Sequence, residues 1–227
     1  GKAKKTGTFW VPLYCDEGAV EVLYSVRVDP QRRTRLTVDW KVTAESAVCV
    51  EVSMKDLAPL RLQVAGGSAR ETCDIVLPRP VAESVSIPCR LTLTSETLLG
   101  PETLLLDTEL SVSLCAAFAP LRLTEGPFAS ALGAPSPRWG SASASVPCSA
   151  RPRHAFKALG GFLRAHLVED TGQAASLAAT APQGCVYFLA KAGAGAVRVE
   201  IRCLCGDAQE SARTAALVAG ALGDLSL

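Results

Sequence analysis

Apolar and charged residues alternate strictly between Ala196 and Cys203, and this pattern restricts the possible folds more than any other part of the chain. Successive side chains of a β-strand point to opposite faces, so the stretch predicts one buried and one solvent-exposed face. The two sets are Val197, Val199 and Ile201, and Arg198, Glu200 and Arg202. An apolar run precedes it at residues 185–190, and the glycine-containing segment 192–195 between them is typical of a turn. The two runs therefore predict a β-hairpin with one buried face.

Helical signals accompany this hairpin in the second half of the chain. Asp207 suits the N-cap of a terminal helix, because its carboxylate accepts hydrogen bonds from free backbone N–H groups. A second, amphipathic helix is predicted over residues 153–166. A third, short helix opens at residues 125–127, where proline is tolerated in the first turn. That helix places Phe128 and Leu132 one turn apart.

Residues 8–115 contain short segments of alternating apolarity separated by turn signals, without a helical pattern. The predicted strands cover residues 8–14, 20–28, 35–42, 48–54, 60–64, 72–77, 84–93 and 104–114. Period-two strands at this spacing are typical of an antiparallel β-sandwich of immunoglobulin type. Trp40 is predicted to be a central core residue of that sandwich, because large aromatic rings more often pack than bind.

The chain is therefore predicted to have mixed β and α+β character, with an immunoglobulin-like β-sandwich followed by an α/β platform, an antiparallel sheet flanked by helices. The predicted divisions are residues 1–7 as the remnant of a basic hinge, 8–115 as the sandwich and 116–227 as the platform, with the join at 115–123. Residues 133–140 are expected to form a loop, followed by a low-complexity Ala/Ser run at 141–145.

Composition argues against several classes of function. The formal net charge of +1 favours neither nucleic acid nor a strongly acidic partner. No run of about 18 apolar residues is present to span a bilayer. The nine cysteines are odd in number and dispersed among apolar strands, which favours free thiols in a reducing compartment. Only Cys203 and Cys205 lie close together, without a second pair, so no metal and no cofactor is predicted.

Candidate catalytic residues are sparse. His154 and His166 lie twelve residues apart, so they cannot form a ligand pair at i, i+4 spacing. Nothing resembles a nucleophile elbow, and the segment Gly193–Gly195 joins two strands, whereas a phosphate-binding loop leads into a helix N-terminus. The chain is predicted not to be an enzyme. A hydrolase with an unrecognised site around one of the histidines stays as an alternative.

Trp139 lies in the predicted loop beside Arg138, a composition typical of a peptide-binding hot spot. Two interpretations are open at this point. The indole ring is either available to a ligand, or it covers the edge of the sheet as part of the packing.

The order of elements after residue 150 resembles a known family. An amphipathic helix is followed by residues 167–170, a small-residue strand, a turn ending at Gly184, a strand ending at Lys191, the hairpin, a strand ending at Cys203 and a terminal helix. This order is similar to the platform of the appendage (ear) domains of clathrin-adaptor large subunits, and within that family to the delta-subunit branch of adaptor protein complex 3. The resemblance covers roughly the last third of the chain, and the first half matches only as an architecture.

The resemblance implies a non-catalytic, cytoplasmic module, peripheral on Golgi and endosomal membranes and coated vesicles. It implies recruitment of accessory or regulatory proteins through short linear motifs during transport from Golgi or endosome to lysosome-type organelles. The domain would belong to a heterotetrameric adaptor complex, through which its membrane association would be indirect, and no nucleic acid is expected. The alternative is a structural domain that packs against other subunits of its own complex.

The peptide site implied by the resemblance lies on the platform. Its candidate residues are Phe128, Leu132, Arg138, Trp139, Lys191 and Arg198. In the endocytic relatives a tryptophan lies four positions after the phenylalanine, where this chain has Leu132, and a second aromatic of that site aligns with Ser176. Both departures weigh against the aromatic motifs that those relatives bind. The expected ligand is a short motif with one bulky apolar anchor and nearby acidic residues, bound with micromolar affinity.

Overall fold

The computed structural model describes residues 8–16, 19–29, 32–97 and 99–227. The chain divides into two compact units. The β unit comprises Trp10–Val112, and the platform unit comprises Ser113–Leu227 together with Thr8 and Phe9. The predicted join at residues 115–123 lies just downstream of this division, and the predicted hinge at residues 1–7 lies outside the described residues.

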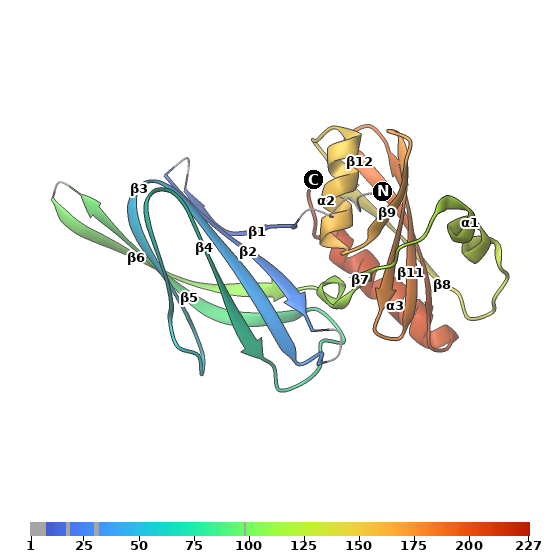
Figure 1. Ribbon diagram of the computed structural model, residues 1–227, viewed down its shortest axis with the longest axis horizontal. Helices are drawn as coiled ribbons and strands as arrows, with labels where there is room; N and C mark the ends of the chain where they lie inside the picture. Colours follow the sequence, from blue (N-terminus) through green and yellow to red (C-terminus); the bar gives the residue numbers. More distant parts are fainter. Residues whose placement is uncertain (1–7, 17–18, 30–31, 98) are drawn as a thin grey trace. The chain divides into compact units, whose positions relative to one another are not determined.

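The six strands that the structure describes in the β unit are antiparallel and form one continuous sheet (Figure 1). They are β1 (Val11–Asp16), β2 (Val20–Val28), β3 (Arg35–Met54), β4 (Leu60–Val76), β5 (Val85–Thr97) and β6 (Gly100–Val112). β4 pairs along most of one edge of β3, while β2 pairs with residues 36–44 and β5 with residues 48–54 on the other edge. Because one edge of β3 has two successive neighbours, the sheet curls into a half-barrel.

Two breaks predicted in the β unit are wrong. Separate strands were expected at 35–42 and 48–54, and at 60–64 and 72–77, whereas each pair is one strand, β3 and β4. The polar residues between Ala44 and Ala47 produce a register irregularity instead of a turn. On the neighbouring strand β4, Gly66 and Gly67 lie opposite this irregularity. Their φ angles are 90° and 108°, which glycine adopts without a steric penalty. Local backbone bends therefore absorb the polar segments, and pairing continues past them.

The core of the β unit lies inside the curl. Trp40 and Leu91 are fully buried, which confirms Trp40 as a packing residue. The Tyr24 hydroxyl donates to the Ser111 carbonyl oxygen at 3.2 Å and accepts from the Ser111 backbone N–H at 2.9 Å. β2 and β6 are not neighbours in the sheet, so these bonds join strands across the core. The predicted antiparallel β character of this half is confirmed.

The platform unit is a second antiparallel sheet with helices on both faces. Its elements are a 3-10 turn η1 (Leu114–Ala117), β7 (Ala119–Pro120), α1 (Glu125–Gly133), β8 (Gly140–Pro147), α2 (Pro152–Phe162), β9 (His166–Asp170), β10 (Ala174–Ala181), β11 (Gly184–Ala192), β12 (Ala196–Cys205) and α3 (Ala208–Gly223). The strand order is β7-β10-β11-β12-β8, and β9 also pairs with β10. The predicted α+β character of this half is confirmed.

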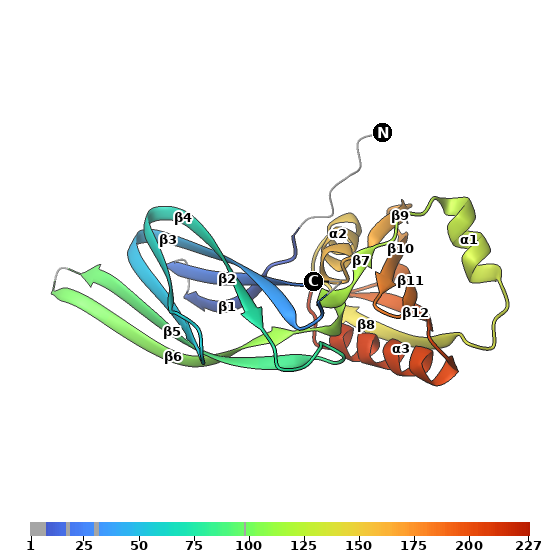
Figure 2. The same ribbon diagram turned by 60° about the horizontal axis from the view of Figure 1, so that its bottom comes forward.

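The two faces of the platform sheet are covered differently. On the inner face, α2 and α3 pack against alternate residues of β10, β11 and β12 in one large core, which includes Phe156, Leu159, Phe188, Ile201 and Val218. On the other face, which we call the outer face, α1 covers part of the sheet (Figures 1 and 2). Because α1 is short, it covers only part of the outer face and leaves the rest of that face open.

Several local predictions for the platform have clear outcomes. The hairpin of β11 and β12 is confirmed, and so is the cap, because the Asp207 carboxylate accepts from the Glu210 backbone N–H at 2.8 Å. The low-complexity Ala/Ser run at 141–145, for which no element was predicted, is the middle of strand β8. The helix predicted to reach His166 ends at Phe162. No helix among the described residues is long and apolar enough to cross a membrane.

Candidate functional site

Three aromatic rings gather on the outer face of the platform sheet. The ring centroid of Tyr187 lies 5.7 Å from that of Phe128 and 5.7 Å from that of Trp139, at interplanar angles of 69° and 67°. Edge-to-face contacts of this kind stabilise by about 0.5–1.5 kcal/mol each beyond the area they bury. Phe128 and Tyr187 are buried, and Trp139 is half-buried. We call these three residues the aromatic cluster.

The positions of the two flanking rings follow from the segment around α1. Phe128 is the buried residue of this helix. After α1 the chain makes a turn in which the Trp139 backbone N–H donates to the Ser136 carbonyl oxygen at 3.3 Å. The indole Nε1 of Trp139 donates to the Ala134 carbonyl oxygen at 3.0 Å, where α1 ends. The end of α1 and the start of β8 are thus held together, and the protein itself orients the indole ring.

Sheet register organises the rest of the outer face into rows across β10, β11, β12 and β8. The rows are Ala178, Tyr187, Arg202, Ser141; then Ser176, Leu189, Glu200, Ser143; then Ala174, Lys191, Arg198, Ser145. Lys191, Arg198 and Arg202 are three exposed cations beside one carboxylate, Glu200. None of these four takes part in an ion pair of the described residues. This open area therefore carries a net positive charge, in contrast to the nearly neutral chain.

The apolar residues predicted for the site do come together. Phe128, Leu132 and Trp139 pack in one cluster with Tyr187 and Ala178. Leu132 is half-buried and contributes to the packing of α1 on the sheet. Because this residue is a leucine, α1 presents no aromatic side chain at the position where the endocytic relatives have a tryptophan.

The predicted cations are divided between two places. Lys191 and Arg198 lie directly opposite each other beside the β11–β12 turn. They are four residues along β11 from Tyr187, which corresponds to about 13 Å of strand. The Arg138 Nη1 atom donates to the Gly206 carbonyl oxygen at 3.5 Å, beyond the other end of β12. One extended ligand can reach both the aromatic cluster and the Lys191–Arg198 pair, whereas Arg138 lies away from that pair.

Tyr187, the central ring of the cluster, is not among the residues predicted for the site. Residues 185–190 form an apolar run, which predicts burial but does not say which side chain faces which layer. The alternation along this strand could have identified Tyr187. The two-residue period that places Lys191 on the solvent-exposed face of the sheet also places Leu189 and Tyr187 on that face.

Tyr187 is the one ionisable residue of the aromatic cluster, and burial raises its pKa. Desolvation, together with the neighbouring Cys185, raises the pKa of Tyr187 to about 12. The phenol therefore stays neutral in the physiological pH range and serves as an aromatic surface, not as an acid or base.

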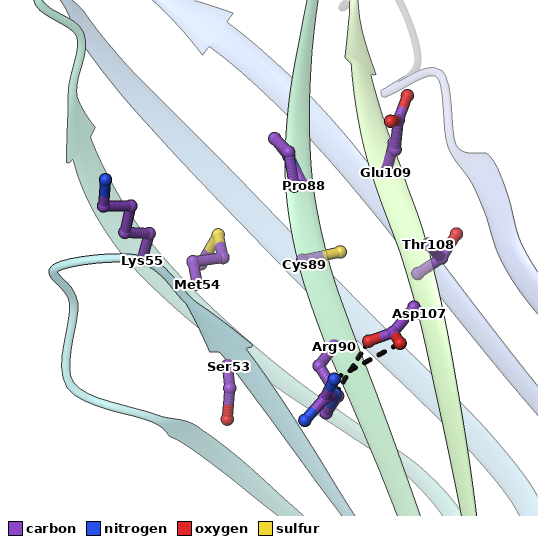
Figure 3. Close-up of a pocket in the computed structure, with 9 residues that line it drawn as sticks. All are labelled: Ser53, Met54, Lys55, Pro88, Cys89, Arg90, Asp107, Thr108 and Glu109. Carbon is purple, nitrogen blue, oxygen red and sulfur yellow. Dashed lines mark hydrogen bonds and ion pairs between the residues drawn. The ribbon is translucent and has the colours of Figure 1, made fainter.

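A recess on the β unit is a separate candidate. It is a shallow depression of about 720 Å³ lined by Ser53, Met54, Lys55, Pro88, Cys89, Arg90, Asp107, Thr108 and Glu109 (Figure 3). Arg90 of β5 and Asp107 of β6, both exposed, form an ion pair at 2.7 Å, so their charges compensate. Burial, with a smaller contribution from Glu109, raises the pKa of the Cys89 thiol to about 11. The thiol is therefore protonated at neutral pH and is not a nucleophile.

The residues considered for catalysis or metal binding are not assembled into a site. Within residues 8–16, 19–29, 32–97 and 99–227, no hydrogen bond joins His154 or His166 to a serine or cysteine, and no group of three metal-ligating side chains occurs. All nine cysteines are free thiols in the structure.

The buried thiols make a testable contrast with the exposed one. Burial raises the pKa of Cys115 from 9.0 to about 12, whereas Cys15 is exposed. We expect iodoacetamide at pH 8 to label Cys15 at least tenfold faster than Cys115 in the folded protein, as measured by peptide mass spectrometry. Because the folded pKa of Cys115 exceeds the unfolded one, its contribution to stability is present below about pH 9 and is lost as the pH rises toward 12. Equal labelling rates in the native protein would contradict the burial of Cys115; in urea the rates should converge.

No protein-family model matches the sequence, and no curated protein matches it.

Proposed function

We propose that this chain is a non-catalytic appendage domain from the delta-subunit branch of adaptor protein complex 3. On this proposal it recruits accessory or regulatory proteins during transport from Golgi or endosome to lysosome-type organelles. It acts in the cytoplasm, and its place on Golgi and endosomal membranes is indirect, through the other subunits of the complex.

The observation that carries the proposal is the outer face of the platform sheet. An aromatic cluster lies beside an open area in which three exposed cations outnumber one carboxylate. A β unit followed by a sheet with α2 and α3 on one face and α1 on the other is consistent with the sequence resemblance. On this proposal the single curled sheet takes the place of the immunoglobulin-type sandwich, with β3 pairing with β2 along one half and with β5 along the other.

The geometry defines the spacing of the motif that this face would bind. Tyr187 and the Lys191–Arg198 pair are about 13 Å apart, and an extended peptide covers that distance in about four residues. A bulky apolar anchor would contact the aromatic cluster, and acidic residues about four positions away would contact Lys191 and Arg198. Short motifs bury little area and lose entropy on ordering, so an affinity on the order of 10 μM is expected.

Charge reversal tests this arrangement. The probe is a fluorescein-labelled ten-residue peptide with one phenylalanine and, four residues later, two aspartates. Arg198→Glu is expected to weaken its binding at least fivefold, because an attraction becomes a repulsion, and to flatten the salt dependence measured by fluorescence anisotropy.

The matched control is Lys157→Glu, the same charge change on an exposed residue of α2, which packs on the inner face. This variant should bind the peptide like the wild type. An equal effect of both variants would show that the peptide responds only to net charge, and the platform site would be wrong.

One observation favours a second candidate, a structural domain that packs against subunits of its own complex. Trp139 is already engaged by Tyr187 and by the Ala134 carbonyl oxygen, so the indole is ordered without a ligand. A preformed, half-buried aromatic surface suits a permanent protein interface as well as a transient peptide. Co-purification of the domain with the other adaptor subunits, abolished by Arg198→Glu, would favour this candidate over peptide recruitment.

A further inference from the structure

The hairpin of β5 and β6 concentrates exposed leucines. Leu99, Leu104 and Leu105 are 97%, 43% and 62% exposed, and they are three of the four large exposed hydrophobic residues in the described part of the chain. Scattered apolar residues are ordinary on protein surfaces, but a group on one hairpin is typical of an interaction surface. The group lies on the β unit, so it is separate from the outer face of the platform.

β6 is an edge strand. Among the described residues it pairs only with β5. The Tyr24 hydroxyl bonds the backbone N–H and carbonyl of Ser111, and the rest of this other edge has backbone donors and acceptors without a strand partner in the described part of the chain. Leu105 pairs with Thr92, and Leu104 pairs with the buried Leu93 on the opposite face of the sheet. Leu104 and Leu105 therefore flank the free edge on both faces, and a strand added at this edge would cover both side chains.

The uncompensated charges around the leucines are negative. Every ionisable residue of β6 is acidic: Glu102, Asp107 and Glu109. Arg90 compensates Asp107, and the Ser86 hydroxyl donates to Glu109. Glu102 and the neighbouring Glu96 are exposed and take part in no ion pair of the described residues. The exposed leucines thus lie beside uncompensated negative charge.

We propose that the free edge of β6 binds an extended basic segment of a partner protein by β-strand addition. The segment would alternate branched apolar residues with lysine or arginine. Backbone hydrogen bonds would provide affinity, and contacts with Leu105 and Glu102 would provide selectivity. A second copy of this chain fits poorly, because antiparallel pairing of β6 with itself would add a strand whose ionisable residues are all acidic to an edge that already has uncompensated negative charge.

Hydrogen exchange locates the binding. The probe is a peptide of four Val-Lys repeats, and the comparison peptide has four Val-Glu repeats. With the Val-Lys peptide, amide exchange within residues 100–112 of the intact chain is expected to slow at least threefold, because free backbone groups become paired. The Val-Glu peptide is expected to bind at least tenfold more weakly by fluorescence anisotropy. Equal binding of the two peptides, or protection confined to other residues, overturns the proposal.

Surface variants test whether the side chains of β6 form the binding surface. Leu105→Lys and Glu102→Lys should each weaken binding of the Val-Lys peptide at least fivefold. Val76→Lys makes the same kind of change as Leu105→Lys at a residue of β4 that is 73% exposed, and it should leave binding unchanged. Trp139→Ala on the platform should also leave it unchanged, so this test can fail independently of the proposed function. If Leu105→Lys binds the Val-Lys peptide as tightly as the wild type does, the proposal is wrong. It is also wrong if the wild-type chain forms a dimer that Leu105→Lys dissociates, because the partner of β6 would then be a second copy of this chain.

Discussion

Replacement of Gly140 by alanine is expected to destabilise the platform unit by about 4 kcal/mol, because the added methyl group would overlap the backbone of α3. A Cβ atom at Gly140 would lie 2.1 Å from the Ser211 carbonyl carbon and 2.4 Å from the Ala212 nitrogen. Both are backbone atoms at the start of α3, so the clash cannot be relieved by a side-chain rotation. The helix would have to move away from β8 and from the core that they share.

Thermal unfolding measures this effect. For a chain of this length about 1 kcal/mol shifts Tm by 2–4 °C, so Gly140→Ala should lower Tm by roughly 10 °C. Gly220→Ala is the matched control, because Gly220 lies inside α3 and no atom lies within 4 Å of its added Cβ. That substitution should stabilise by up to about 1 kcal/mol through helix propensity. Similar Tm values for the two variants would show that α3 does not pack against β8 as described.

Trp139→Ala is expected to weaken binding of the phenylalanine–aspartate peptide by about 30-fold, or roughly 2 kcal/mol, as for a hot-spot tryptophan. The substitution removes one wall of the aromatic cluster and uncovers Tyr187. Because the ring is half-buried and its Nε1 is hydrogen-bonded, we also expect a loss of stability of about 1–2 kcal/mol. Binding should therefore be measured well below the Tm of the variant.

Trp10→Ala provides the comparison. Trp10 belongs to the β unit, where the Arg70 guanidinium lies 5.5 Å from the centroid of its ring. Its removal should reduce stability to a similar extent but leave peptide affinity unchanged. If Trp139→Ala unfolds the platform, the ring is a core residue and the packing interpretation is right. If it stays folded and binds the peptide normally, the platform is not the binding surface.

The sequence predicted the elements whose signals are local. The alternation from Ala196 to Cys203 was sufficient for β12, because burial on one face requires that period whatever the neighbouring strand is. The Asp207 cap depends on atoms three residues apart, and the burial of Trp40 depends on its size and on the apolar residues around it. These predictions were confirmed because little outside the segment bears on them.

The sequence patterns missed strand pairing where a distant partner decided the outcome. Residues 141–145 contain only serine and alanine, and they form a strand because β12 offers them a complete hydrogen-bonding edge. The polar break near Glu45 does not end β3, since β4 pairs with both sides of it. In both cases the pairing energy with another strand outweighs the weak local preference.

For the site, local periodicity predicts which side chains share the solvent-exposed face of β12, and it places Phe128 and Leu132 on one side of α1. The position of Tyr187 between Phe128 and Trp139 appears only in the folded chain, and so does the separation of the Lys191–Arg198 pair from Arg138. The difference arises because periodicity determines the face of each element, whereas sheet register and the path of the loop before β8 determine which faces meet. Register is decided by hydrogen bonds between segments far apart in the chain, and no short stretch of sequence contains both partners.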